Sequence, residues 1–199
     1  HGITGSGKTE VYMDLIDYTI KKGKSVIVLI PEIALTYQTV MRFTRRFKEK
    51  VSIINSRLSS GERYDQFERA KNGDVTIMIG PRSALFTPFS NLGLIVIDEE
   101  HESAYKSESV PKYHAIEVAQ KRAYDTGATV VLGSATPSLE SYYKAKNGTY
   151  ILHKITTREK GKLPSVSIVD LREELQQGNK SIFSNKLQTL INDRLEKKE

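Results

Sequence analysis

His1-Gly2-Ile3-Thr4-Gly5-Ser6-Gly7-Lys8-Thr9 opens the chain and follows the pattern G-x-x-x-x-G-K-T. The glycines let the backbone curl so that successive N–H groups point at phosphate oxygens. The Lys8 ammonium can reach the β- and γ-phosphates of a nucleotide, and the Thr9 hydroxyl can bind Mg²⁺. A helix should follow, with its N-terminus facing the anion. A glycine-rich turn that only caps a helix is the alternative. The predicted phosphate-binding residues are Gly2, Thr4, Gly5, Ser6, Gly7, Lys8 and Thr9.

Such a loop normally connects a strand to a helix. Here the sequence has nothing before His1 and does not begin with methionine. We therefore expect the 199 residues to be a segment of a longer protein, without the strand that leads into the loop.

The composition is that of an ordinary soluble protein, with 38% hydrophobic residues, 27% charged residues and a formal net charge of +6. This modest positive charge is compatible with an anionic partner but does not identify one. Cysteine is absent, which excludes disulfides and thiolate metal sites within these residues. No apolar run approaches the roughly 20 residues of a membrane-spanning helix, so we expect a cytoplasmic protein without a membrane partner.

Apolar runs alternate with helical patterns along most of the chain. Continuous apolar runs are typical of strands whose sheet is covered on both faces, and their alternation with helices predicts an α/β sandwich. Strands are expected at 25–30, 51–54, 75–79, 92–97 and 128–132, and a further one at Ser165–Val169. Helices are expected from Thr9 to Gly23, from Ile33 through Lys48, at 61–71, at 113–124, and after a capping Ser184.

An acidic stretch, Asp98-Glu99-Glu100-His101, directly follows the apolar strand expected at 92–97. Taken alone it could be a solvated acidic turn. Together with the phosphate-binding loop it completes a nucleotide site, in which Asp98 holds Mg²⁺ and Glu99 orients and deprotonates the attacking water. We therefore predict that Lys8, Asp98 and Glu99 are catalytic, with Thr9 and Asp98 on the metal.

A third motif, Gly133-Ser134-Ala135-Thr136-Pro137, also follows an apolar strand. On its own it could be a turn in which Ser134 or Thr136 caps the next helix. The order G-x-x-x-x-G-K-T, D-E-E-H, S-A-T nevertheless resembles the motif I, II and III series of superfamily 2 helicases. That resemblance implies a sensing role for His101, and a link between nucleotide and nucleic acid at Ser134, Ala135 and Thr136.

Further stretches narrow the resemblance to the PriA family of replication-restart helicases (primosomal protein N′), over essentially the whole chain. One segment departs from the family pattern: Asn55-Ser56-Arg57-Leu58-Ser59 has arginine where a glycine is expected, which puts a backbone contact to phosphate there in doubt. The stretches that carry the resemblance are Thr4–Tyr12, Pro31–Thr36, Arg82–Phe86, Asp98–His101, Leu163-Pro164, Val169–Arg172 and Gly178-Asn179.

The resemblance implies a RecA-like P-loop NTPase fold, a three-layer sandwich around a mostly parallel sheet. Residues 1–155 would form the first motor lobe, 156–164 a linker and 165–199 the start of the second lobe. The implied activity is ATP- and Mg²⁺-dependent 3′→5′ DNA unwinding in primosome assembly and replication restart at stalled forks. Implied partners are single-stranded and forked DNA, other primosome proteins, single-stranded-DNA-binding protein and the second lobe.

The family also has a zinc region, which would lie outside these residues, and a place at the bacterial nucleoid. By itself the segment should be inactive, because the arginine that completes ATP hydrolysis belongs to the second lobe.

The resemblance to the PriA family also implies which residues contact DNA. It implies phosphate contacts at Pro31, Glu32 and Thr36 and at Arg82 and Ser83, although Arg82 could instead form a buried ion pair. The polar, aromatic stretch from Glu102 to His114 resembles a loop that senses single-stranded DNA; a plain surface loop is the alternative. Its candidate contacts are Tyr105, Lys106, Lys112, Tyr113 and His114. The cations Arg42, Arg45, Arg46 and Lys48 are interpreted as a solvated helix face.

Two other functions remain open at this stage. A nucleotide-gated binding module would change its affinity for DNA or a protein partner without turnover. A P-loop kinase is a weaker alternative, because it would need neither a DNA-sensing loop nor an S-A-T turn.

Overall fold

The computed structural model describes residues 1–157 and 165–198. The chain divides into two compact units, residues 1–160 and 161–199. Of the linker predicted at 156–164, residues 158–164 lie outside the described residues, as does the Leu163-Pro164 pair.

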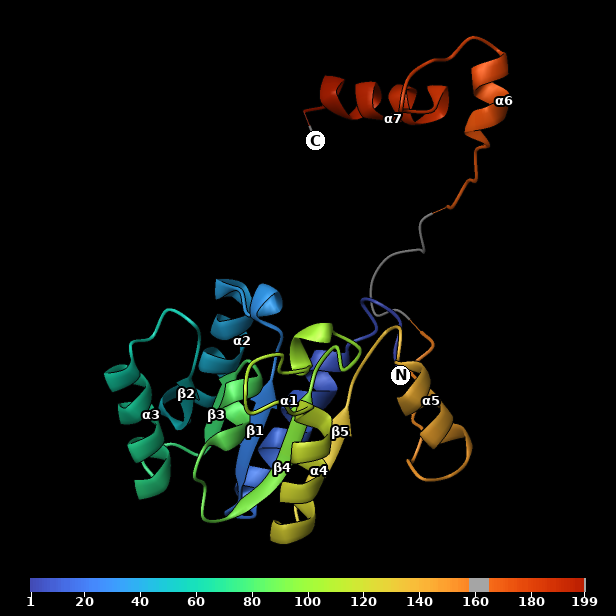
Figure 1. Ribbon diagram of the computed structural model, residues 1–199. Coiled ribbons are helices and arrows are strands. Elements are labelled where there is room, and N and C mark those ends of the chain that lie inside the picture. The colour runs from blue at the N-terminus through green and yellow to red at the C-terminus, as the bar shows by residue number, and fades with distance from the viewer. Residues whose placement is uncertain (158–164, 199) are drawn as a thin grey trace. The chain divides into compact units, whose positions relative to one another are not determined.

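The first unit is built on a five-stranded sheet in the order β2-β3-β1-β4-β5 (Figure 1). All of its described pairings are parallel, so the expected "mostly parallel" sheet is wholly parallel here. The strands are β1 (Ser25–Leu29), β2 (Val51–Ile53), β3 (Ile77–Gly80), β4 (Leu92–Ile97) and β5 (Thr129–Leu132).

Helices cover both faces of this sheet, which makes the three layers of the predicted RecA-like α/β fold. One core cluster joins α1 and α2 to the sheet, and a second cluster joins α3 and α4 to the opposite face. The helices of this unit are α1 (Lys8–Lys21), α2 (Tyr37–Phe47), α3 (Ser60–Asn72), α4 (Ala115–Thr126) and α5 (Leu139–Lys146). Four short 3₁₀ turns lie at η1 (Glu32–Ala34), η2 (Lys48–Lys50), η3 (Arg82–Phe86) and η4 (Ser103–Tyr105).

The apolar runs become strands because both faces of the sheet are buried. Side chains of β1 alternate between the two core clusters: Ile27 and Leu29 join one, and Val26 and Val28 join the other. Parallel strands end at the same edge of the sheet, so the chain segments after β1, β4 and β5 are brought together there.

The helix expected from Ile33 through Lys48 is shorter than predicted. Glu32–Ala34 forms a 3₁₀ turn, and α2 begins only after Thr36, whose side chain accepts a hydrogen bond from the Thr39 N–H at 3.3 Å. A side-chain cap of this kind fixes the start of a helix, and the apolar pattern alone could not locate it.

The buried face of α1 also differs from the expected one. The helical spacing of Val11, Leu15, Ile16 and Ile20 predicts that these four residues lie on one face. In the structure Tyr12, Met13 and Ile16 are buried, whereas Val11 is 45% exposed. The cations of α2 are exposed as predicted, but two of them pair with α1. Arg42 contacts Glu10 at 2.8 Å, and Arg46 contacts Asp14 at 2.5 Å.

The second unit contains α6 (Leu171–Gln176) and α7 (Asn185–Glu196) in its described part. The prediction of a strand at Ser165–Val169 is wrong, because these residues carry no strand pairing. The prediction of a helix capped by Ser184 is confirmed, since its side chain accepts a hydrogen bond from the Leu187 N–H at 3.1 Å.

Among the described residues, no helix is long and apolar enough to cross a membrane.

Candidate nucleotide site and DNA-facing loops

The phosphate-binding loop curls as its glycines predict. Gly5 and Gly7 have φ angles of 77° and 83°, in the left-handed region that glycine adopts without strain. Gly7 is the residue before α1 and provides no side-chain cap for it. The N-terminus of α1 is thus available to an anion.

Main-chain bonds tie this loop to the turn after β5. The Gly2 N–H donates to the Ser134 carbonyl at 3.1 Å, and Gly2 also forms a parallel bridge with Ile155. A Cβ atom on Gly2 would lie 2.6 Å from the Ser6 hydroxyl oxygen, so a side chain at this position would force Ser6 to move.

Lys8 connects the loop to the acidic turn after β4. Its Nζ donates to the Gly2 carbonyl at 3.0 Å and lies 3.9 Å from a Glu99 carboxylate oxygen. Two motifs that are about 90 residues apart in sequence therefore meet at one place. This contact brings together two of the residues predicted to be catalytic.

Two buried tyrosines hold Asp98. The Tyr12 hydroxyl donates to Asp98 Oδ1 at 3.0 Å, and the Tyr105 hydroxyl donates to the Asp98 main-chain carbonyl at 2.6 Å. Burial raises the pKa of the Asp98 carboxyl, while the Tyr12 hydrogen bond opposes that rise. Burial also raises the pKa of both phenols, so the two tyrosines remain protonated donors.

Glu99 has a left-handed backbone, with φ at 47°. A non-glycine residue in this region costs on the order of 1–3 kcal/mol, and such residues concentrate at functional sites. The Glu99 carboxylate contacts Lys8 and His101. The distance from Glu99 Oε2 to His101 Nδ1 is 3.7 Å. The carboxylate predicted to act on water is thus held between two cationic or polar groups.

The residues predicted to couple nucleotide and nucleic acid contact one another. His101 Nδ1 is 2.8 Å from the Ser134 hydroxyl, and Nε2 is 3.4 Å from the Thr136 hydroxyl. Ala135 lies between the two hydroxyl residues, and its carbonyl is 3.0 Å from the His1 ring. The acidic turn and the S-A-T turn therefore form one hydrogen-bonded unit.

Sequence reasoning did not assign a role to Glu100, which is only 3% exposed. Its carboxylate accepts hydrogen bonds from the Ser138 N–H at 2.7 Å and from the hydroxyls of Ser138 and Ser141. Ser138 is the N-cap of α5, so the cap is neither Ser134 nor Thr136 as the capping alternative had it. No local signal pairs Glu100 with a helix that begins almost forty residues later.

The donor set suits Mg²⁺ bound together with a nucleotide. Among the described residues, no group of three or more His, Cys, Asp or Glu side chains could hold a metal ion alone. Mg²⁺ usually keeps several waters and takes one or two protein oxygens plus substrate phosphates. The Asp98 carboxylate and the Thr9 hydroxyl would supply such oxygens beside the phosphate-binding loop.

The residues expected to contact DNA after β1 have contacts within the protein. Pro31 is buried, and the exposed Glu32 accepts a hydrogen bond from the Ser56 N–H at 3.0 Å. Thr36 caps α2. Arg57, at the position where a glycine was expected, is exposed and is not among the positive-φ residues of the described chain.

Arg82 follows β3 and organises the loop after the acidic turn. Its Nη1 donates to the carbonyls of Ala104 at 3.1 Å and Lys106 at 2.5 Å. These carbonyls flank Tyr105, so Arg82 holds the main chain on both sides of that tyrosine. The ion pair considered as an alternative for Arg82 is replaced by these main-chain contacts, while Ser83 is half-buried in the same 3₁₀ turn.

The prediction that Tyr105 stacks on DNA is wrong for this structure. Tyr105 is 1% exposed, and its hydroxyl bonds two strand-end carbonyls, those of Leu29 and Asp98. The other candidates lie further along the loop, where Lys106 and Lys112 are exposed. Tyr113 is half-buried with its ring edge-on to Phe86, and His114 caps α4 through Nδ1.

Replacing Tyr105 with phenylalanine should destabilise the chain by about 1–3 kcal/mol, because the Asp98 carbonyl loses its buried donor. Leu29 retains the Asp98 N–H as a donor at 2.9 Å, so the loss falls mainly on one carbonyl. Urea unfolding followed by circular dichroism measures the change. Tyr124→Phe is the matched control, because Tyr124 is 86% exposed and its loss should be within about 0.5 kcal/mol. Equal stabilities for the two variants would contradict the assigned role.

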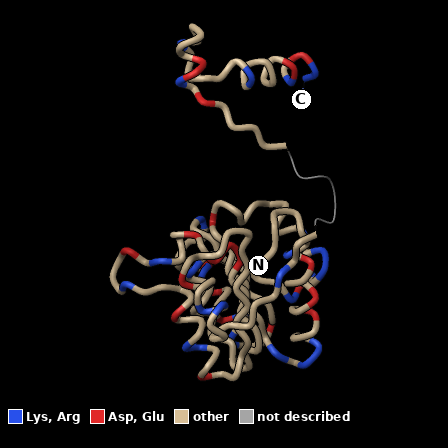
Figure 2. Tube along the Cα trace, turned by 90° about the vertical axis from the view of Figure 1, so that its right-hand side faces the viewer, with Lys and Arg blue, Asp and Glu red and all other residues tan. Residues whose placement is uncertain are grey.

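Charge alone does not mark a DNA-binding face. In the view of Figure 2, Lys and Arg are interspersed with Asp and Glu along the trace of the first unit.

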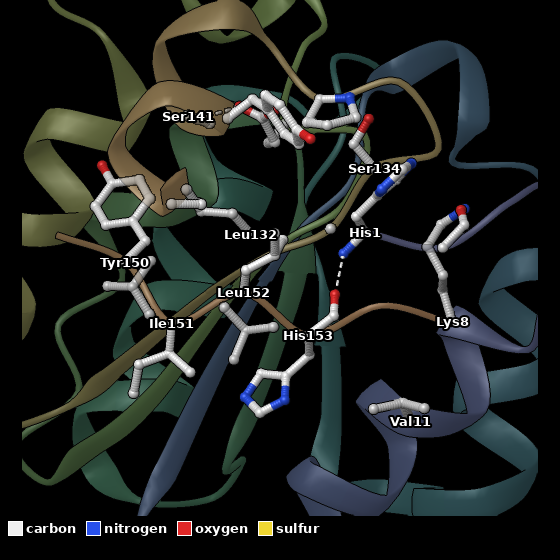
Figure 3. A pocket seen from close by; sticks show the side chains of 18 of the residues that line it. His1, Lys8, Val11, Leu132, Ser134, Ser141, Tyr150, Ile151, Leu152 and His153 are labelled. Carbon is white, nitrogen blue, oxygen red and sulfur yellow. Dashed lines mark hydrogen bonds between the residues drawn. The ribbon is translucent and has the colours of Figure 1, made fainter. Parts of the chain in front are cut away.

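A cavity with a volume of about 580 Å³ lies along the outer edge of β5 (Figure 3). Its lining is mainly apolar, with Leu132 from β5 facing Ile151 and Leu152. The amino terminus of His1 donates to the His153 carbonyl beside it, at 2.8 Å. The cavity also reaches Gly2 and Lys8 of the phosphate-binding loop and Ser134. Its apolar part along β5 does not suit a triphosphate, so the nucleotide is assigned to the loop and the acidic turn.

Comparison with known proteins identifies the family and the fold. A family profile described as DEAD/DEAH box helicase matches residues 1–145. Two solved structures with the same fold are the helicase domain of Pyrococcus furiosus Hef and RecG bound to a three-way DNA junction. Hef aligns with 80% of this chain and 34% of its own at a TM-score of 0.55 and 23% identity. The RecG structure aligns with 78% of this chain and 20% of the RecG chain, at a TM-score of 0.55 and 22% identity.

The fold and the family match define the class: the chain belongs to the DEAD/DEAH box helicase family. Within that class its similarity is to PriA. It is 51% identical to the replication restart protein PriA of Bacillus subtilis over 100% of this chain, and 48% identical to that of Synechocystis over 97%. The expected resemblance to PriA is thus confirmed. The chain spans about a quarter of the length of these curated relatives.

Proposed function

We propose that this chain is the ATP-binding motor lobe of an ATP-dependent DNA helicase that acts in replication restart. One observation carries the proposal: Lys8 of the phosphate-binding loop contacts Glu99, and His101 of the same acidic turn contacts Ser134. Three separate motifs therefore form one continuous site. The similarity to PriA over the whole chain supports the biological role.

In this proposal each group has a defined task. The loop from Gly2 to Thr9 binds the phosphates, with Lys8 on the β- and γ-phosphates. Thr9 and Asp98 hold Mg²⁺, which neutralises charge on the phosphates when it is bound. Glu99 orients the attacking water and takes its proton. His101 and the Ser134–Thr136 turn transmit the state of the site.

The DNA-facing part of the proposal rests on the loops after β1, β3 and β4. Glu32, Thr36, Ser83, Lys106 and Lys112 are at least partly accessible there. Their contacts would be to the phosphate backbone, which positions a strand without reading its sequence. We assign 3′→5′ movement, forked DNA substrates and a place beside the bacterial chromosome by resemblance to PriA. Primosome proteins and single-stranded-DNA-binding protein are partners on the same ground.

The second lobe is part of the proposed enzyme. In helicases of this class the nucleotide is expected to lie between two lobes, and an arginine from the second lobe stabilises transition-state charge. Such an arginine contributes roughly 10³–10⁵-fold to turnover in related phosphoryl-transfer enzymes. The isolated chain should consequently hydrolyse ATP very slowly. Zinc would be bound elsewhere in the full-length protein.

ATP turnover with and without single-stranded DNA tests this proposal, measured on the isolated chain and on the full-length protein. We expect DNA-stimulated hydrolysis by the full-length protein and almost none by the chain alone. Rapid hydrolysis by the chain alone would show that Glu99 and Lys8 act without a second lobe. Hydrolysis that ignores DNA would favour a P-loop enzyme with another substrate.

The alternative, a nucleotide-gated binding module, is not favoured by the helicase family match or by the similarity to PriA. It predicts nucleotide binding without turnover in the full-length protein, together with a nucleotide-dependent change in DNA affinity. Fluorescence anisotropy of labelled single-stranded DNA, with and without ATP, distinguishes the two.

A further inference from the structure

Tyr12 is buried beneath the candidate metal site. It lies in the first half of α1, is 4% exposed, and points its hydroxyl at Asp98 Oδ1, 3.0 Å away. A buried tyrosine normally finds an acceptor for its hydroxyl, and a main-chain carbonyl would be sufficient. Here the acceptor is instead the carboxylate to which we assign Mg²⁺.

The space for the Tyr12 hydroxyl exists only because residue 133 is glycine. A Cβ atom at Gly133 would lie 1.6 Å from the Tyr12 hydroxyl oxygen and 2.7 Å from Cζ. The backbone at Gly133 cannot move aside easily, because its N–H donates to Ile97 at 2.9 Å and its carbonyl accepts from Glu100 at 3.0 Å. The main chain at the end of β5 therefore fixes the space that the Tyr12 hydroxyl occupies.

The carboxylate and the main chain of Asp98 are held by different tyrosines. Tyr105 binds the Asp98 carbonyl and fixes the backbone, whereas Tyr12 binds a side-chain oxygen and fixes the carboxylate torsion. Tyr12 belongs to the helix that begins at Lys8. The hydrogen bond therefore sets the carboxylate relative to the phosphate-binding loop itself.

We propose that Tyr12 is a positioning residue, whose hydrogen bond orients the Asp98 carboxylate for the Mg²⁺ ion that accompanies the nucleotide. Groups that orient a metal ligand in this way typically change metal affinity or activity by about 10–100-fold when they are removed. The inference rests on the proposed ATP site. It extends that site by naming what holds its metal ligand in place.

Tyr12→Phe in the full-length protein tests the proposal, because phenylalanine keeps the ring and removes only the hydroxyl. The readout is binding of the fluorescent nucleotide mant-ADP, titrated with Mg²⁺ and repeated in EDTA. We expect the half-saturating Mg²⁺ concentration to rise about tenfold, with the affinity in EDTA unchanged. Tyr18→Phe on the same helix is the control, since Tyr18 is 60% exposed and should leave both values unchanged.

Gly133→Ala provides a second route to the same contact, because the added methyl displaces the hydroxyl from Asp98. It should raise the Mg²⁺ requirement in the same direction. Two variants that break one contact are not additive. The double variant should therefore change the Mg²⁺ requirement by less than the product of the two single changes.

Asp98→Asn separates failure of this inference from failure of the proposed site. If Asp98→Asn raises the Mg²⁺ requirement and Tyr12→Phe does not, Tyr12 does not position the ligand. Equal weakening of mant-ADP binding by Tyr12→Phe in EDTA and in Mg²⁺ also overturns the inference, because it indicates a purely structural role. If Asp98→Asn itself leaves the Mg²⁺ requirement unchanged, the proposed metal ligand is wrong and the inference falls with it.

Discussion

Glu99→Gln in the full-length protein is expected to reduce ATP turnover by about 10²–10⁴-fold, the usual contribution of a positioned general base. Glutamine keeps the size and polarity of the side chain but cannot accept the proton of the attacking water. The contacts of Glu99 to Lys8 and His101 are at 3.9 Å and 3.7 Å, so neither is a tight ion pair on which the fold depends. ATP binding should therefore persist.

The measurement is steady-state ATP hydrolysis at saturating single-stranded DNA, together with the Kd for mant-ADP. Glu49→Gln is the matched control, because Glu49 is exposed in η2, outside the nucleotide site and the DNA-facing loops. It is not assigned to the attacking water, so its turnover should stay close to that of the unmodified protein. If Glu99→Gln lowered turnover by less than about tenfold, the general base would have to be a group other than Glu99.

Local patterns predicted much of the fold. The ends of each strand in the first unit lie within three residues of the ends of the apolar run that predicted it. A continuous apolar run is well predicted as a strand because a sheet covered on both faces buries every residue of the run. The phosphate-binding loop was predicted from nine residues, since Gly5 and Gly7 have backbone angles that other residues avoid. Both signals are contained within a short stretch of chain.

Tyr105 shows what such patterns miss. Its neighbours Glu102, Lys106 and Ser107 are polar, which favoured a surface loop. Its hydroxyl partners are Leu29 and Asp98, at the ends of β1 and β4, and only the strand order makes those two carbonyls adjacent. An aromatic residue in a polar stretch can therefore be buried when its partners are at the ends of strands that are distant in sequence.

Tyr12 and Glu100 were missed for the same reason. Tyr12 is one residue from Val11, and the helical pattern did not separate the buried position from the exposed one. Glu100 was treated as part of an acidic run, yet it is the buried acceptor for the start of α5. The roles of both depend on partners that the sheet brings near, and these partners are far away along the chain.

The prediction of a strand at Ser165–Val169 was wrong for the opposite reason. Alternating apolar residues, Val166 and Ile168, favoured a strand, but a strand needs a neighbour to satisfy its main-chain groups. The described part of the second unit provides helices α6 and α7 and no strand partner. The pattern was present, and the pairing that would make it a strand was not.

Lys8→Ala should have the opposite kinetic signature to Glu99→Gln, with loss of binding rather than of chemistry. The Lys8 ammonium is expected on the β- and γ-phosphates, and a hydrogen bond to a charged group contributes about 1.5–3 kcal/mol. That range corresponds to roughly a 10–150-fold weaker Kd for each such contact. We therefore expect mant-ADP affinity to fall by about 100-fold, with turnover lost at any practical ATP concentration.

Isothermal titration or mant-ADP fluorescence measures the loss, and Lys21→Ala is the matched control. Lys21 lies at the other end of α1 and pairs with the half-buried Asp17, at 2.5 Å. Its removal changes the net charge equally but should leave nucleotide affinity unchanged. If the two variants bound nucleotide alike, the anion site would not be the N-terminus of α1. If Lys8→Ala bound normally but failed to turn over, Lys8 would act on the transition state alone, and the ground-state phosphate contact would be wrong.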